Sequence, residues 1–241
     1  MIGGRRNIHE LMDDPAADEE TLESALHELS MINRWLGGDR ASRRGVRRIL
    51  GSLPADRPIS VLDVASGGSD LSRALAPLGR TFEVTALDLN PRTGDFARKH
   101  GRPITAIVGS AHALPFDERS FDIAHVALFL HHCTDEEARA LLENLSRIVR
   151  FGIVINDLHR HAIAYASISL LTGLFSRSVC VRHDAPVSVL RGFLRREIAA
   201  LVPARLQTSI SWLWAFRWCV SVIVSDPIDD TSSRWYDTSS R

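Results

Sequence analysis

The chain has 241 residues, of which 45% are hydrophobic and 24% charged, and 29 Lys and Arg balance 29 Asp and Glu. This length suits one or two domains with a substantial core, and the ordinary composition excludes wholesale disorder. Zero net charge excludes strong global attraction to nucleic acid or to an anionic membrane and leaves only local patches. The three cysteines, Cys133, Cys180 and Cys219, are far apart, so we expect neither a disulfide framework nor a metal site.

Targeting and spanning segments are not expected. Residues 1–14 contain no apolar run that suits a signal peptide. The longest apolar stretch, residues 162–175, is shorter than the roughly 20 residues of a membrane-spanning helix and contains Tyr, Ser and Thr. We therefore expect a cytoplasmic protein that does not insert into a membrane.

The N-terminal segment begins with many acidic residues and then turns helical. Asp14-Pro15 is typical of a helix opening, an N-cap followed by Pro at the first helical position. Apolar residues recur at three- or four-residue steps from Leu22 to Leu36, which predicts an amphipathic helix that ends at Gly37-Gly38.

A second helix is predicted over residues 41–50, and arginines dominate it and its approach. These arginines either contact RNA or phosphate, or form a solvated face. We favour the solvated face, because no aromatic residues interleave with the arginines as single-strand binding would require. The basic residues are Arg40, Arg43, Arg44, Arg47 and Arg48.

From residue 59 onward, short β-rich runs alternate with helical stretches. Strands are predicted at residues 60–64, 82–87, 104–108, 121–129 and 153–155, and helices at residues 71–78, 94–100 and 135–149. Such alternation favours βαβ units and a parallel sheet, with the functional loops at the carboxyl ends of the strands.

The remaining chain breaks this rhythm. Residues 159–202 are predicted to be mostly helical, with a loop near residues 182–186, and to form a lid. Strands follow at residues 206–213 and 216–224, and we expect a frayed polar tail. We therefore divide the chain into an N-terminal helical segment that covers the pocket, a cofactor-binding α/β core, a helical lid, the final strands and the tail. Their bounds are 1–58, 59–158, 159–203, 204–224 and 225–241.

The most informative sequence is VLDVASGGSDL at residues 61–71. A strand ends in an acid, and a turn of small residues then enters a helix, so a ligand can lie against the backbone. Further along, VTALDLNP at residues 84–91 places Asp88 at the end of the second strand, where a carboxylate can accept both ribose hydroxyls. Together the two features indicate a nucleoside ligand.

Two further blocks complete the pattern, GSAHALPF at residues 109–116 and LFLHH at residues 128–132. In this order and spacing, the blocks over residues 59–157 resemble a class I S-adenosylmethionine-dependent methyltransferase of the ubiquinone/menaquinone-biosynthesis type. The resemblance implies an α/β, Rossmann-like fold, a seven-stranded, mostly parallel sheet with helices on both faces. N-terminal helices and a helical lid insert would be added to it.

The resemblance also implies which residues bind the cofactor, S-adenosylmethionine. The turn after the first strand would hold its methionine part, Asp88 its ribose, and the loop after the third strand its adenine. The chain departs from the family at Ala65 and Ser69, where glycines are usual, and at Ser110, where Asp is usual. The expected cofactor contacts are Asp63, Val64, Ala65, Ser66, Gly67, Asp88, Leu89, Ser110, Ala111, His112 and Ala127.

Catalysis needs a nucleophile held in line with an activated methyl group and, for a hydroxyl acceptor, a base. Lys99 is the only lysine and lies away from the expected pocket, so we look to histidine and carboxylate. His132 is the favoured base, followed by His131, with Asp157 as a further candidate. Arg34, Trp35, Asn156, His159 and Tyr165 are expected to contact the acceptor, a small apolar or aromatic molecule.

The predicted reaction is O-methylation of a phenol, quinol or polyketide hydroxyl, and C-methylation is the near alternative. A second hypothesis is a methyltransferase fold that uses the cofactor structurally, for a reaction without methyl transfer. RNA binding through the arginine helix and a nicotinamide oxidoreductase rank lower, so no nucleic acid partner is expected. The oligomeric state stays open at this point.

Overall fold

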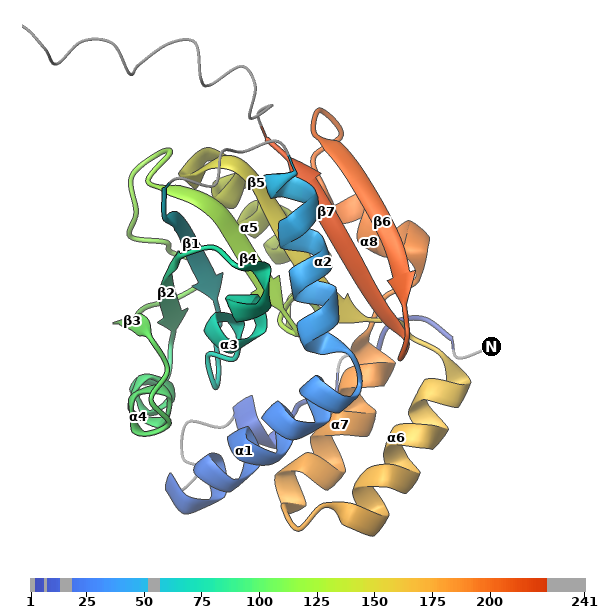
Figure 1. Ribbon diagram of the computed structural model, residues 1–241. Helices are drawn as coiled ribbons and strands as arrows, with labels where there is room; N and C mark the ends of the chain where they lie inside the picture. Colours follow the sequence, from blue (N-terminus) through green and yellow to red (C-terminus); the bar gives the residue numbers. More distant parts are fainter. Residues whose placement is uncertain (1–2, 7, 14–18, 52–56, 225–241) are drawn as a thin grey trace, which may run out of the picture.

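A seven-stranded sheet forms the centre of the computed structural model, which describes residues 3–6, 8–13, 19–51 and 57–224 (Figure 1). The strand order is β3-β2-β1-β4-β5-β7-β6, in which β1 to β5 are parallel and β7 is antiparallel to both neighbours. The predicted fold class is therefore confirmed. The strands are β1 (Ile59–Val64), β2 (Phe82–Asp88), β3 (Ile104–Val108), β4 (Phe121–Ala127), β5 (Val149–Leu158), β6 (Gln207–Leu213) and β7 (Arg217–Ile223).

Helices pack on both faces of this sheet. Helices α2 and α3 bury apolar residues such as Val46, Ile49 and Leu75 against one face, and α5 and α8 bury Leu142 and Ile198 against the other. The helices of the sheet layers are α2 (Gly38–Leu50), α3 (Leu71–Leu75), α4 (Pro91–Lys99), α5 (Asp135–Ile148) and α8 (Arg195–Leu201), with short 3₁₀ turns η2 (Ala76–Leu78) and η3 (Leu130–His132).

A third group of helices lies beyond the carboxyl ends of the parallel strands (Figure 1). It consists of α1 (Glu19–Trp35), α6 (Ala162–Phe175) and α7 (Val179–Arg191), with the 3₁₀ turn η1 (Leu11–Asp13) against α7. Ala25, Ile168 and Val181 meet in its small core. This group covers the edge of the sheet at which the functional loops emerge.

The loop predicted near residues 182–186 is wrong, because α7 runs through it with Pro186 inside the helix. An internal proline costs a helix about 3 kcal/mol. Here the burial of Val181, Ala185 and Val189 offsets that cost. The carboxylate of Asp184 further fixes α7, since it accepts the backbone N–H groups of Leu11 and Met12.

Other predicted elements differ mainly at their ends. Helix α4 begins at Pro91 rather than residue 94, because the Asn90 side chain accepts the Arg92 N–H as an N-cap. Strand β5 is far longer than the predicted 153–155, because it pairs along its length with both β4 and β7. The predicted helix opening at Asp14-Pro15 and the predicted frayed tail lie outside the described residues.

None of the described helices is long and apolar enough to cross a membrane. The longest of the three helices beyond the strand ends, α1, has 17 residues, and the most apolar, α6, has 14. The stretch at residues 162–175, the longest apolar run in the sequence, is α6 itself.

Close packing around β5 generates a first prediction. A Cβ on Gly152 would lie 2.3 Å from the carbonyl oxygen of Val222 and 3.0 Å from Ile49 Cδ1. We expect Gly152→Ala to lower the free energy of unfolding by about 1–3 kcal/mol in urea titrations, because the backbone must shift. The matched control is Gly173→Ala in α6, where no atom lies within 4 Å of the new methyl group. It should raise stability by about 0.5–1 kcal/mol, and equal effects of the two changes would contradict this packing.

Candidate active site

The turn that follows β1, residues 65–69, exposes its backbone, and we call it the cradle. Ala65, Gly67 and Ser69 all have positive φ, at 51°, 49° and 54°. The turn is tied to the end of β2, since Ser66 N–H donates to the carbonyl of Leu87 and Gly67 N–H donates to Asp88 Oδ2 at 2.8 Å. Small side chains in left-handed conformations leave the backbone open to a ligand. Ala65 and Ser69 thus adopt the conformation for which glycine is the usual residue.

Asp88 lies beside this cradle with one backbone N–H on each carboxylate oxygen. Asn90 N–H donates to Oδ1 at 2.9 Å, opposite the bond from Gly67 to Oδ2. The Leu89 N–H adds a further backbone bond, and a carboxylate with about four lone-pair sites keeps capacity for a hydroxyl donor. Burial raises the pKa of the Asp88 carboxyl more than these N–H groups lower it.

The surroundings of Asp88 suit a flat, partly apolar ligand. Leu89 is 72% exposed directly after the acid. On the neighbouring loop, Ala111 is buried, His112 is exposed, and the Ser110 hydroxyl accepts the His112 N–H. Above the cradle, Leu26 of α1 comes within 3.9 Å of an ideal Cβ on Gly67. The donors and acceptors at this edge therefore fit a nucleoside cofactor with a ribose diol at Asp88.

A buried chain of polar side chains runs beneath the cradle, and it contains two of the predicted contact residues. Asp63 Oδ1 lies 2.7 Å from His125 Nδ1, and His125 Nε2 lies 2.8 Å from Ser42 Oγ. Asn156 Nδ2 donates to the same Ser42 hydroxyl at 3.1 Å, and Arg217 donates to Asn156 Oδ1 at 3.3 Å. The side chains of Asp63 and Asn156 are thus bonded inside the protein, under the site rather than facing it.

Burial dominates the electrostatics of this chain. It raises the pKa of Asp63 more than the neighbouring His125 lowers it, and it lowers the pKa of Arg217 to about 10. Sequence reasoning missed Ser42, His125 and Arg217. The available signal was a histidine in the middle of the otherwise buried strand FDIAHVA, since a polar side chain at such a position needs a partner.

His131 and His132 occupy the 3₁₀ turn after β4 and differ in accessibility. The His131 side chain is 2% exposed, and its Nδ1 lies 2.7 Å from Oδ1 of the fully buried Asp157. The His132 side chain is 22% exposed, and its Nε2 lies 3.7 Å from Glu10 Oε2. The structure therefore brings both histidines and Asp157 together, with His132 as the accessible imidazole.

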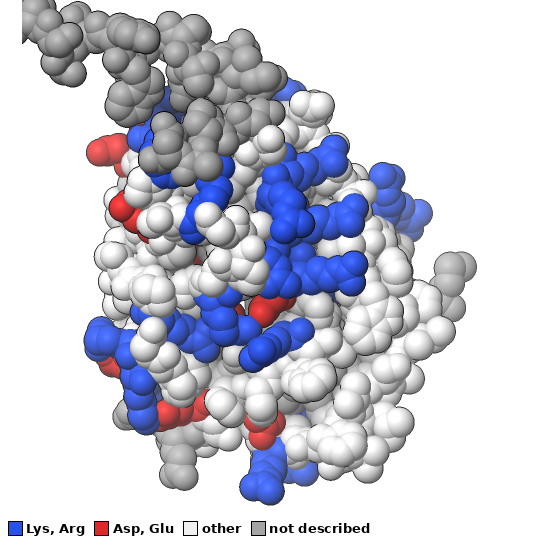
Figure 2. Space-filling model, viewed as in Figure 1, with Lys and Arg blue, Asp and Glu red and all other residues white. Residues whose placement is uncertain are grey.

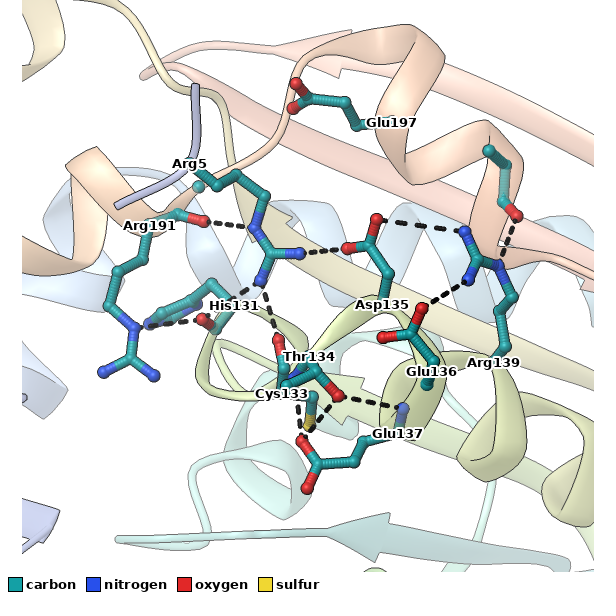
Figure 3. Close-up of polar contacts among 12 residues, drawn as sticks. Arg5, His131, Cys133, Thr134, Asp135, Glu136, Glu137, Arg139, Arg191 and Glu197 are labelled. Carbon is teal, nitrogen blue, oxygen red and sulfur yellow. Dashed lines mark hydrogen bonds and ion pairs between the residues drawn. The ribbon is translucent and has the colours of Figure 1, made fainter. Parts of the chain in front are cut away.

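Two arginines from distant segments clamp the turn that carries these histidines (Figure 3). Arg191 donates to the carbonyls of His131 and His132, both at 3.0 Å. Arg5 donates to the carbonyl of Cys133 at 2.8 Å and pairs with Asp135. The N-terminal segment, which the sequence predicts to cover the pocket, also supplies Glu10 beside this turn, and the sequence did not single out Arg5 or Glu10.

Glu10, His131 and His132 are also the one group of described residues with the geometry to hold a metal ion, since their ligand atoms lie within 4.8 Å of one another. The Arg191 guanidinium lies 3.7 Å from Glu10 Oε1. Its charge already balances the carboxylate and opposes a second cation there. We therefore interpret these residues as an ion-pair network and assign no metal to them.

The other predicted residues spread over a wider surface. His159 Nδ1 accepts the indole N–H of Trp212 at 3.1 Å, and burial, with the nearby charge of His161, lowers the pKa of His159. Tyr165 on α6 is 39% exposed and Trp35 at the end of α1 is 79% exposed.

Arg34 lines a surface hollow with Arg40, Asp39 and Arg73 rather than facing the histidines. Ala127 ends β4 and is followed by Leu128 with a φ of 54°.

Comparison with known proteins agrees with this architecture. Residues 61–152 match the family described as a methyltransferase domain. The demethylmenaquinone methyltransferase of Thermotoga maritima is 29% identical over 201 residues, covering 78% of this chain and 83% of that protein. These findings support a class I S-adenosylmethionine-dependent methyltransferase, with the methyltransferase domain at residues 61–152.

Other relatives match a smaller part of this chain. The demethylmenaquinone methyltransferase of Renibacterium salmoninarum is 34% identical, covering 59% of this chain and 54% of that protein. The chain spans about half the length of several such relatives. Among solved structures, the plantazolicin methyltransferase BpumL in complex with SAH has a TM-score of 0.62 at 14% identity, covering 85% of this chain and 95% of that one. That likeness shows the shared fold.

The buried contact between His131 and Asp157 generates a second prediction. The charge and hydrogen bond of His131 outweigh burial and hold the pKa of Asp157 below its ordinary value. Because the folded-state pKa is lowered, the pair stabilises the fold above the unfolded-state pKa of about 3.9 and loses this effect as pH falls.

We therefore expect Asp157→Asn to lower the free energy of unfolding at neutral pH by on the order of 3 kcal/mol. The difference from the wild type should shrink as pH falls below about 4. Chemical denaturation across pH measures both effects. The control Asp95→Asn changes an exposed pair with Arg98 and should leave stability within about 0.5 kcal/mol. A difference for Asp157→Asn that stays constant across pH would show that the ion pair does not stabilise the fold.

Proposed function

We propose that this protein transfers the methyl group of S-adenosylmethionine to a small aromatic acceptor, a phenol or quinol, with oxygen as the first candidate for the nucleophile. The accessible His132, next to a carboxylate and on the same sheet edge as the cradle and Asp88, is the observation that carries the proposal. The cofactor supplies an activated methyl group. The protein then has to hold the acceptor in line and remove its proton.

Cofactor binding is assigned to the cradle and the two loops beside it. The backbone of residues 63–67 would lie against the methionine part, and Asp88 would accept the ribose hydroxyls. Leu89 would cover one face of the adenine. Ser110, Ala111, His112 and Ala127 are assigned to the same pocket from the family pattern. The exposed Leu89 and the remaining acceptor capacity of the Asp88 carboxylate support this assignment.

His132 is proposed as the general base. Neutral imidazole can take a phenol proton, and the His132 side chain is the accessible imidazole of this turn. His131 is proposed as a positioning residue, because its ring is buried and bonded to Asp157. Asp157 is assigned to the same role rather than to proton removal, since its Oδ1 also accepts the Leu158 N–H.

The base assignment gives a third prediction. We expect His132→Gln to lower kcat for methylation of a phenolic acceptor by at least about a hundredfold, the usual contribution of general-base catalysis. Binding of S-adenosylhomocysteine, followed by calorimetry, should stay within about twofold. The control is His9→Gln, at an exposed histidine in the N-terminal segment that carries Glu10. Near-normal turnover of His132→Gln would remove His132 from this role.

The ribose assignment gives a fourth prediction. Asp88→Ala should weaken S-adenosylhomocysteine binding by at least about tenfold, because two hydrogen bonds to a charged acceptor are lost. Asp95→Ala, on the exposed side of α4, is the matched control and should bind normally. Equal affinity of the two variants would place the ribose elsewhere.

Ring C-methylation is the second candidate reaction. It is favoured by the name of a relative from Bradyrhizobium diazoefficiens, a ubiquinone/menaquinone biosynthesis C-methyltransferase that is 26% identical over 69% of this chain and 71% of that protein. Removal of a phenol proton by His132 serves both reactions, because the phenolate is nucleophilic at oxygen and at the ring. Incubation with labelled cofactor and a panel of phenols and quinols, with NMR of the product, separates them. Cofactor binding without label in any product would favour the hypothesis of a fold that uses the cofactor structurally.

A further inference from the structure

Helix α6 presents an unusually apolar surface to solvent. Its sequence, AIAYASISLLTGLF, contains no charged residue, and only Ala164, Ile168 and Thr172 are buried. Leu170, Leu174 and Phe175 are 63%, 67% and 77% exposed, and Val179 at the start of α7 is 64% exposed. A contiguous exposed patch of this kind marks an interaction surface.

Three exposed tryptophans lie between α6 and α2, at the end of α1, on β6 and in the turn between β6 and β7. Trp35, Trp212 and Trp214 are 79%, 48% and 64% exposed. The turn between β6 and β7 contacts both the α1–α2 junction and the start of α6. Ala215 N–H donates to the carbonyl of Leu36 between α1 and α2, and Phe216 stacks on the ring of His161, which caps α6.

The outer side of α2 carries a basic ridge. Arg40, Arg44, Arg47 and Arg48 are exposed along it, while Ala41, Val46 and Ile49 face the sheet. Figure 2 shows arginines gathered over α2 beside a broad uncharged area to the right and below. The chain has no net charge, so this ridge is a local concentration of positive charge.

We propose that this face docks on an anionic lipid bilayer. The arginine ridge would contact acidic headgroups, the tryptophans would lie at the level of the headgroups, and the apolar side of α6 would enter the upper acyl region. Tryptophan is the residue typical of that interface, because its ring is apolar and its N–H is polar. Docking is peripheral, since no described helix is able to cross a membrane.

By charge alone the same ridge would suit RNA, but the apolar face decides between the two partners. The aliphatic side chains of Leu170, Leu174 and Val179 have no role on an RNA surface, whereas a bilayer buries them. Helix α6 also adjoins the carboxyl edge of the sheet (Figure 1). If the proposed function is correct, an apolar phenol or quinol would therefore reach the site from the bilayer.

Vesicle flotation tests this docking without any measurement of methyl transfer, so its failure is separate from a failure of the proposed function. The full chain is mixed with vesicles of phosphatidylcholine alone, or of phosphatidylcholine with phosphatidylglycerol. We expect at least tenfold more protein to float with the anionic vesicles, and added NaCl should reduce this excess because salt screens headgroup attraction.

Two variants and two matched controls locate the surface. Leu174→Asp with Phe175→Asp should abolish flotation, and Arg44→Gln with Arg47→Gln should reduce it at least tenfold on anionic vesicles. Val108→Asp, at an exposed apolar residue on the β3 edge, and Arg98→Gln, on the exposed side of α4, should float as the wild type does. Circular dichroism confirms that each variant is folded.

Several outcomes would overturn the proposal. One is wild-type protein that does not float, and another is an α6 double variant that floats as well as the wild type. A third is self-association in sedimentation velocity that Leu174→Asp abolishes while vesicles bind no protein, since a second copy would then cover the face. A fourth is tight, salt-sensitive binding of polyuridylate that the arginine variant loses and the α6 variant keeps, with no preference for anionic vesicles.

Discussion

The buried polar chain from Asp63 to Arg217 is the constraint on which the site depends. Five side chains that would each be costly to bury alone satisfy one another across the carboxyl ends of β1, β4 and β5, the amino end of the antiparallel β7, and α2. If Asp63 is ionised, His125 donates from Nδ1 and accepts the Ser42 hydroxyl at Nε2, so that every donor meets an acceptor. Such a chain holds its bonds in only one arrangement of the strands and of α2.

This chain also positions what lies above it. Asn156 donates to the carbonyl of Gly38, and Arg217 donates to the carbonyl of Leu36, so the α1–α2 junction is bonded to the sheet. Helix α1 is thereby fixed over the cradle, where Leu26 approaches Gly67. The ligand-facing surface consists mostly of backbone and of Asp88, while the polar side chains below supply rigidity.

On the acceptor side, rigidity comes from hydrogen bonds between charged side chains and the backbone of distant segments. Arg191 lies 60 residues from His131 and clamps the turn that presents both histidines. Glu10 adds a carboxylate from the N-terminal segment, which η1 and Asp184 hold against α7. Helix α7 holds the N-terminal segment and packs on α6, which carries the exposed apolar face. The proposed acceptor side and the proposed bilayer surface therefore belong to the same group of helices.

The sequence by itself determined the α/β alternation, the cradle after β1 and the acid at the end of β2, because each depends on residues within a few positions of one another. It also pointed to the turn after β4, but it did not distinguish His131 from His132. Local patterns wrongly predicted a loop at residues 182–186, where tertiary burial keeps α7 intact around Pro186.

Only the tertiary structure decided which polar groups meet. Hydrogen bonds and ion pairs act over a few ångströms in space, and their partners here are often more than a hundred residues apart, as with Arg5 and Cys133 or Asn156 and Ser42. No periodicity in the chain encodes such pairs. The folded sheet brings them together and so decides that the side chains of Asp63 and Asn156 bond inside the protein, while Asp88 and His132 lie at the sheet edge where we propose the site.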